Sequence, residues 1–289
     1  MAEKFKLKWG SFGTGPGQFV SPTGIAVYQN EVYVTDTANN RVQVFDLDGT
    51  FKREWGSLGG GPGQFDSPKG IDVNVDVYVA DTENDRIQKF TTAGSYITKW
   101  GIFGTGPGMF SSPLDISVLE NETFVSDSGN NRIQVFDLVG TFGRQWGSYG
   151  SGDGQFSSLK ENKSNASEVF AVDSGNSRIQ VFDLNGSFLR KWGSTGSGDG
   201  QFSAPYGIDI ASNEVFVLEN LNQRVQVFDL DGTFNRKWGS SGTGDGQFKY
   251  PFGIAVTTKQ RFCVDSSNNR IQRFDIAAKI QYLPIMGVG

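Results

Sequence analysis

The sequence predicts an all-β protein, because three short markers recur six times in phase along its 289 residues. The first is Trp-Gly, at tryptophans 45 or 46 residues apart. The second is a phenylalanine after Gly-Gln, or Gly-Met once, and the third is a D/E-x-x-N-x-R motif. Four short strands in a repeat of about 40–50 residues are typical of a propeller blade. The predicted fold class is therefore a six-bladed β-propeller of four-stranded antiparallel blades.

The first complete repeat shows the four expected strands in order. Gly24–Val27 follows a Ser-Pro pair, Val32–Asp36 is rich in β-branched residues, and Arg41–Asp46 alternates apolar and polar side chains. Thr50–Trp55 ends the repeat at the tryptophan. Asp48-Gly49, a dipeptide that accepts positive φ, lies where a tight hairpin would join the third and fourth strands.

The two ends of the chain predict how the ring closes. The N-terminal segment Phe5–Trp9 matches the fourth strand Phe51–Trp55, but no first three strands precede it. The sixth repeat has its first three strands and lacks the final tryptophan. We therefore expect the N-terminal strand to complete the last blade, which removes an open sheet edge. The tail segment Lys279–Leu283 is the alternative for that place, or an additional outer strand.

Composition is consistent with a single propeller domain over residues 1–289. The 39 glycines indicate many turns, and 37% hydrophobic residues suffice for a buried core. The chain has no histidine, the commonest general base and zinc ligand, and Cys263 is its single cysteine. Because no stretch of about 18 apolar residues occurs, we expect no membrane insertion. We expect a monomer, cytoplasmic by default and extracellular if a leader has been removed.

The repeat closely resembles the NHL repeat. Residues 20–65 follow that family's pattern almost letter for letter, and the resemblance extends over about residues 5–275. It implies a six-bladed propeller. Proteins that look like this include RNA-binding domains, sensor domains, peptidyl-amidating lyases and scaffolds, so the resemblance leaves the function open.

The most repetitive features are expected to be structural. Each glycine-rich loop, such as Gly13–Phe19, opens onto a strand rather than a helix, which excludes a dinucleotide cradle or P-loop. In the D/E-x-x-N-x-R motif we expect the acid to end the second strand and the arginine to pair with it. The asparagine is expected to take the unusual turn conformation. A ring of six arginines for phosphates or carboxylates is the functional alternative.

The candidate partner-binding residues come from positions where the repeats differ. After the repeat proline the residues are Thr23, Lys69, Leu114, Lys160, Tyr206 and Phe252. Blades 5 and 6 thus present Tyr206, Tyr250 and Phe252, with Leu221 in the neighbouring loop, and blade 2 presents Lys69. Neighbouring exposed aromatics are typical anchors of protein interfaces. Scatter of side chains over the blades is the alternative.

Two further departures concern the innermost strands. Asp72 and Asp209 occupy equivalent positions in blades 2 and 5, and carboxylates around a channel can hold Ca²⁺. Each can instead hydrogen-bond to a neighbouring blade. In blade 4, Lys160–Asn165 replaces the usual apolar strand without a change in length. For residues 159–168, a looped-out strand, a functional polar insertion and a sequence error all remain open.

The leading hypothesis is a non-enzymatic binding or scaffold module that presents its loop face to a protein or peptide, with no cofactor. A lyase- or hydrolase-type propeller enzyme with a carboxylate-bound calcium is the first alternative, which the absence of histidine disfavours. An RNA-binding domain is the second, and a formal charge of −5 argues against it.

Overall fold

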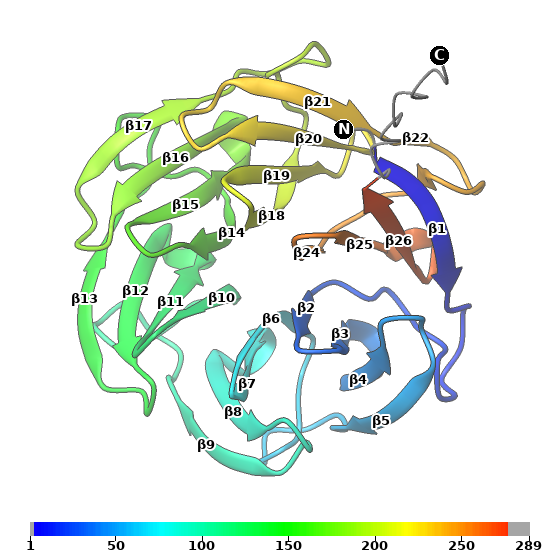
Figure 1. Ribbon diagram of the computed structural model, residues 1–289. Coiled ribbons are helices and arrows are strands. Elements are labelled where there is room, and N and C mark those ends of the chain that lie inside the picture. Colours follow the sequence, from blue (N-terminus) through cyan, green and yellow to red (C-terminus); the bar gives the residue numbers. More distant parts are fainter. Residues whose placement is uncertain (1–2, 277–289) are drawn as a thin grey trace, which may run out of the picture.

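The computed structural model describes residues 3–276 and forms a ring of six antiparallel, four-stranded sheets around a central channel (Figure 1). The first strand of every blade lies nearest the centre, and in blades 1 to 5 the chain runs outward through all four strands before it enters the next blade. The predicted all-β propeller is confirmed. Among the described residues, no helix is both long enough and apolar enough to cross a membrane.

Strand boundaries repeat closely from blade to blade. Blade 1 contains β2 (Ile25–Tyr28), β3 (Glu31–Asp36), β4 (Arg41–Asp46) and β5 (Phe51–Trp55). Blade 2 contains β6 (Pro68–Asn74), β7 (Asp76–Asp81), β8 (Arg86–Thr91) and β9 (Tyr96–Trp100). Blade 3 contains β10 (Pro113–Leu119), β11 (Glu122–Asp127), β12 (Arg132–Asp137) and β13 (Phe142–Trp146). Blade 4 contains β14 (Leu159–Ser164), β15 (Glu168–Asp173), β16 (Arg178–Asp183) and β17 (Phe188–Trp192).

Blade 5 contains β18 (Pro205–Ala211), β19 (Glu214–Glu219), β20 (Arg224–Asp229) and β21 (Phe234–Trp238). Blade 6 contains β24 (Ile254–Val256), β25 (Gln260–Asp265), β26 (Arg270–Ile276) and β1 (Glu3–Trp9). The short strands β22 (Ser240–Ser241) and β23 (Gln247–Phe248) pair with each other in parallel. Short 3₁₀ turns follow the second strand in five blades: η1 (Thr37–Asn39), η2 (Thr82–Asn84), η3 (Ser128–Asn130), η4 (Ser174–Asn176) and η5 (Ser266–Asn268).

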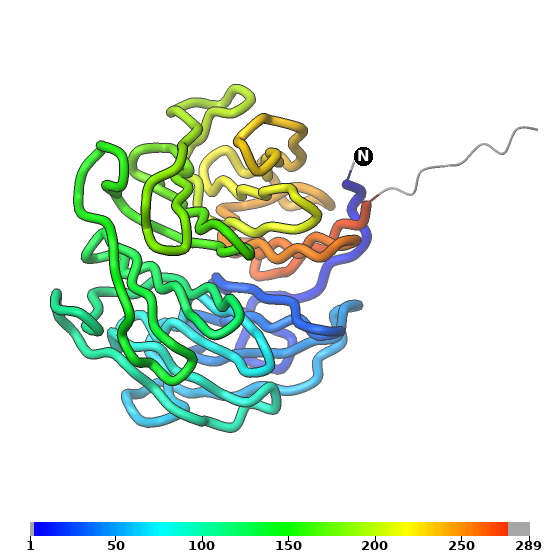
Figure 2. The backbone as a smooth tube through the Cα atoms, turned by 60° about the vertical axis from the view of Figure 1, so that its left-hand side comes forward, coloured from blue at the N-terminus to red at the C-terminus, as the bar shows by residue number. Residues whose placement is uncertain are grey.

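The N-terminal strand closes the ring, as predicted. β1 pairs with β26, with Phe5 opposite Phe274 and Trp9 opposite Ile271. Figure 2 shows the start of the chain beside the end of the described part. Glu3 is nearly buried and lies 2.7 Å from Arg236 of blade 5, so an ion pair joins the closing strand to the neighbouring blade. The alternative segment Lys279–Leu283 lies outside the described residues.

The D/E-x-x-N-x-R motif holds the glycine-rich loop against its own blade. In blade 1, Arg41 Nε donates to Asp36 Oδ2 at 2.8 Å, and its other nitrogens donate to carbonyls of the loop, including that of Gly15. Asn39 donates to both Asp36 and the carbonyl of Gly13. The predicted structural role is therefore confirmed. One detail was wrong: the residue after the asparagine, here Asn40, has the positive φ.

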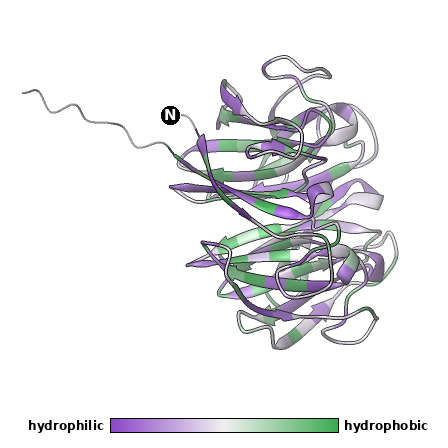
Figure 3. Cartoon of the chain, turned by 90° about the vertical axis from the view of Figure 1, so that its right-hand side faces the viewer, coloured by the Kyte–Doolittle hydropathy of each residue, from purple (hydrophilic) through white to green (hydrophobic). Residues whose placement is uncertain are grey.

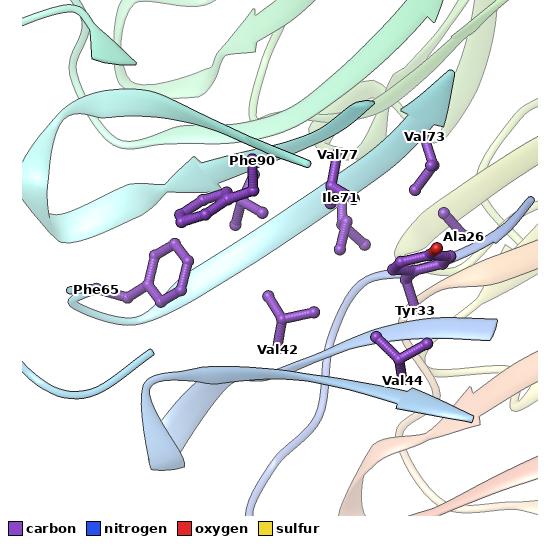
Figure 4. Packing of buried hydrophobic residues seen from close by; sticks show 10 residues of the cluster. Ala26, Tyr33, Val42, Val44, Phe65, Ile71, Val73, Val77 and Phe90 are labelled. Carbon is purple, nitrogen blue, oxygen red and sulfur yellow. The ribbon is translucent and has the colours of Figure 1, made fainter. Parts of the chain in front are cut away.

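Apolar side chains fill the space between neighbouring blades. The cluster in Figure 4 contains Tyr33 and Val44 of blade 1 with Ile71 and Phe90 of blade 2. Viewed from the side, green hydrophobic and purple hydrophilic segments alternate along the strands, and many of the loops are pale (Figure 3). In blades 1, 2, 3, 4 and 6 the tryptophan also packs on a glycine turn of the next blade: a Cβ at Gly140 would lie 2.6 Å from Trp100 Cγ. The repeated Trp and Gly therefore form one interlocking contact.

Candidate binding site at the channel mouth

One face of the ring collects the loops in which the repeats differ. In blade 2, Pro68 at the start of the innermost strand lies opposite Asp81, where the second strand ends and η2 begins. The other end of the same pair, Asn74 opposite Asp76, reaches the far face. The residue after the repeat proline, or after Leu159 at that position in blade 4, therefore lies at one mouth of the channel in every blade.

A cavity of about 390 Å³ opens at this mouth, and we call it the mouth pocket. Its lining includes the whole post-proline row, one residue from each blade, together with two serines and a glycine. The lining residues are Thr23, Lys69, Ser112, Leu114, Ser128, Gly129, Lys160, Tyr206 and Phe252. The residues that were selected because the repeats differ at this position therefore lie together in the mouth pocket.

Two of the predicted aromatic residues contact each other in this pocket. The rings of Tyr206 and Phe252 lie 4.6 Å apart at an interplanar angle of 85°, an edge-to-face pair. Lys160 Nζ lies 5.5 Å from the centre of the Tyr206 ring, within cation–π range. Burial raises the pKa of the Tyr206 hydroxyl above its usual value. The pair forms an apolar wall that spans blades 5 and 6.

The other two predicted apolar residues lie beside the pocket rather than in its lining. Leu221 and Tyr250 are 54% and 44% exposed, and Asn220 Nδ2 donates to the carbonyl of Pro251, so the two loops are adjacent. Tyr250 has a φ of 44°, and the serine or alanine at this position in the other five blades also has a positive φ, between 48° and 57°. The left-handed turn therefore belongs to the repeat, and the exposed aromatic ring is what distinguishes blade 6 at this position.

Lys69 and Lys160 make one side of the mouth pocket positive. Burial lowers the pKa of both ammonium groups, and the proximity of Lys69 lowers that of Lys160 further. Glu83 raises the pKa of Lys69 through its charge. Lys160 belongs to the same post-proline row as Lys69, but its role in the pocket was missed because blade 4 as a whole looked irregular.

The inner channel below the mouth is lined by carboxyl groups that bridge neighbouring blades. Asp115 Oδ2 of blade 3 accepts from the backbone N–H of Asn162 at 2.9 Å, and Glu161 Oε2 of blade 4 accepts from that of Ile208 at 3.0 Å. Burial raises the pKa of Asp115 to about 7 and the pKa of Glu161 well above its usual value. These two side chains replace the glycine found there in the other four blades.

Asp72 and Asp209, the candidate calcium ligands, form the same kind of bridge. Asp72 Oδ2 accepts from the N–H of Val118 at 2.9 Å, and Asp209 Oδ2 accepts from that of Val256 at 2.7 Å. Lys163 Nζ lies between the two carboxylates, 3.1 Å from Asp72 and 3.5 Å from Asp209. An ammonium group thus occupies the place that a cation would take between them. Within residues 3–276, no group of three or more His, Cys, Asp or Glu is arranged to hold a metal.

The polar segment of blade 4 is a regular part of the fold. β14 pairs with β15, with Asn162 opposite Ala171 and Ser164 opposite Val169, so it is not looped out. Asn162 Nδ2 donates to Ser126 Oγ of blade 3, and the hydroxyls of Ser164 and Ser117 lie 2.8 Å apart. The polar strand is matched by polar partners in blades 2, 3 and 5, which the segment alone could not reveal.

Comparison with known proteins agrees with the observed architecture. A family model described as "6-bladed beta-propeller" matches residues 109–192 and 197–284, more than half of the chain. The NHL repeat model matches residues 19–45. Protein brain tumor of Drosophila melanogaster is 48% identical over 48 residues, a match that covers 16% of this chain and 5% of that protein. The chain therefore matches only a small part of this relative's length.

Two solved structures have the same fold at low sequence identity. A Bacteroides thetaiotaomicron protein of unknown function has a TM-score of 0.72 and 18% identity, over 95% of this chain and 76% of that one. Staphylococcus aureus virginiamycin B lyase has a TM-score of 0.62 and 14% identity, over 92% and 82%. That structure is of a catalytically inactive form with histidine replaced by alanine. At these identities the similarity shows the fold alone.

Proposed function

Because the chain belongs to the six-bladed β-propeller family built from NHL repeats, we propose that it is a non-enzymatic binding or scaffold module. Its partner is a protein or peptide, and its binding surface is the mouth pocket with the adjacent residues Leu221 and Tyr250. The observation that carries the proposal is the contact of Tyr206 with Phe252 in a pocket built from the positions where the repeats differ. Buried aromatic anchors beside a pocket dominate the binding energy of many interfaces.

The alternatives from the sequence gain less support. The histidine that the lyase needs has no counterpart here, since the chain contains none. A calcium-dependent hydrolase would need the carboxylates of Asp72 and Asp209, and the ammonium group of Lys163 already lies between them. RNA binding would need a positive face, whereas the motif arginines are paired with acids and the formal charge is −5.

The test is a quantitative pull-down with the Tyr206→Ala/Phe252→Ala double variant. The matched control is Val75→Ala/Val139→Ala, which removes two exposed apolar side chains from turns on the far face. We expect the affinity of the mouth variant for its partner to fall by a factor of ten or more, because truncation of an anchor residue commonly costs about 2 kcal/mol or more of binding free energy. The control should retain the partner. If the mouth variant folds and keeps every partner, the proposal is wrong.

A further inference from the structure

The positive side of the mouth pocket is not neutralised by the protein itself. Lys69 and Lys160 come from blades 2 and 4, both are partly buried in the lining, and neither forms an ion pair with a carboxylate in residues 3–276. Glu83 is exposed, and it raises the pKa of Lys69 through its charge without forming an ion pair. An anion placed between the two ammonium groups would relieve their repulsion and gain two charge-assisted contacts.

The same pocket also has apolar walls. Tyr206 and Phe252 of blades 5 and 6 form an edge-to-face pair next to Lys160, and the nearly buried Leu114 adds an aliphatic surface in blade 3, between the two blades that carry the lysines. A ligand that fits both the lysines and these walls needs an apolar side chain and an anionic group within a few ångströms of each other. The pocket volume of about 390 Å³ matches a few side chains rather than an extended polymer.

The floor of the pocket is lined by carboxyl groups and by a lysine that is already paired. Asp115 and Glu161 directly follow Leu114 and Lys160 in the chain and line the inner channel, and Lys163 joins Asp72 to Asp209 below them. An anionic group is therefore attracted to the level of the two lysines, because the carboxyl groups of Asp115 and Glu161 beneath it offer no positive charge and, with their raised pKa values, are partly protonated at neutral pH.

We propose that the mouth pocket binds a peptide segment that carries a carboxylate beside an aromatic or aliphatic side chain. The carboxylate, from Asp, Glu or a chain terminus, lies between Lys69 and Lys160, and the apolar side chain lies against Tyr206 and Phe252. This inference rests on the proposed binding function and specifies its ligand. A peptide is favoured over nucleic acid because two lysines above a carboxyl-lined floor match a single anion, not a row of phosphates.

The first experiment probes wild-type protein on a random heptapeptide array, printed once with free and once with amidated C-termini. We expect the bound peptides to be enriched in Asp or Glu next to an apolar residue. If the bound carboxylate is a chain terminus, binding should instead be confined to the array with free termini. Equal binding to acidic and neutral peptides on both arrays would overturn the inference.

The second experiment measures a selected fluorescent peptide by anisotropy. The Lys69→Met/Lys160→Met variant should raise its Kd roughly tenfold or more, the effect of losing a charge-assisted contact. Lys237→Met, which removes an exposed lysine paired with Asp199 on the rim, should leave the Kd unchanged. A peptide with its carboxylate replaced by an amide should bind wild type as weakly as the acidic peptide binds the lysine variant. An unchanged Kd in the lysine variant would overturn the inference.

The outcomes separate this inference from the proposed function. If wild type binds peptides, and the Tyr206→Ala/Phe252→Ala variant does not, but acids are not enriched, the ligand class is wrong and the binding function stands. If wild type binds no peptide and loses no partner on aromatic substitution, the proposed function itself fails. Competition by a 20-nucleotide poly(U) at about 150 mM salt would assign the mouth to nucleic acid and overturn the peptide proposal.

Discussion

Replacement of Lys163 by methionine removes the cation that lies between two carboxylates of the inner channel. The ammonium is 3.1 Å from Asp72, where the attraction is about 5 kcal/mol at an effective dielectric constant near 20. Desolvation of the charges offsets much of that attraction. Breaking a buried pair from one side costs about 3–5 kcal/mol. Because the Lys163 side chain is 26% exposed, we expect a loss of about 2–4 kcal/mol in the free energy of unfolding.

The effect should depend on pH in a defined direction. Burial already raises the pKa of Asp209, and Lys163 opposes that rise, so the variant should raise this pKa further. A carboxyl whose folded pKa exceeds its unfolded value destabilises the fold as pH increases through that interval. The deficit of the variant relative to wild type should therefore shrink as the pH falls from 7 toward about 4.

Urea unfolding followed by tryptophan fluorescence measures both effects. Lys69→Met is the matched control, because it makes the same substitution in the mouth pocket where no ion pair is lost. We expect the control to stay within about 0.5–1 kcal/mol of wild type at both pH values. The reasoning is refuted if Lys163→Met unfolds at the wild-type urea midpoint at pH 7, or if its deficit grows as the pH falls.

Three further predictions concern the channel, the closure and the blade contacts. Since burial raises the pKa of Asp115 to about 7, its contribution to stability should fall as pH rises from about 4 to 7; Asp115→Asn should flatten that slope in urea midpoints. Glu3→Ala should cost about 2–4 kcal/mol because it strips a nearly buried carboxylate from the closing strand. The exposed ion-pair variant Lys8→Ala should cost less than about 1 kcal/mol, and the same urea unfolding measures both variants. Gly140→Ala should lose more than about 2 kcal/mol, because its Cβ meets an indole, whereas Gly108→Ala, with open space and a similar φ, should lose about 1 kcal/mol. Equal losses at the two glycines would show that φ strain, and not the tryptophan contact, limits the position.

The architecture could be predicted from the sequence because every blade repeats the same strand and turn motifs. Phe5 and Trp9 belong to a fourth-strand motif that no first three strands precede, and this unaccompanied strand predicted the pairing of β1 with β26. The pairing of Arg41 with Asp36 followed from their spacing around one turn. The positive φ was misplaced onto Asn39 because two asparagines occur together, and only the turn geometry shows which of them carries it.

The site could be predicted only in part, because its contacts join distant repeats. Tyr206 and Phe252 were selected as deviations within one row, and that row also contained Lys160. The roles of Lys163 and Asp72 depend on a contact across the channel between blades 4 and 2, 91 residues apart in the chain. A contact between residues so far apart in the chain cannot be predicted from local periodicity or composition. The sequence therefore did not show which side chains the polar strand of blade 4 would contact.

The measurement that tests the account most directly is hydrogen exchange of the protein with and without its captured partner. The account predicts protection at the six segments that begin the innermost strands at the mouth, including residues 67–70, 158–161, 204–207 and 250–253. The far-face turns around Val75 and Val139 should exchange at the same rate in both states. Protection confined to the far face or the outer strands, with an unchanged mouth, would contradict the assignment of the mouth pocket as the binding site.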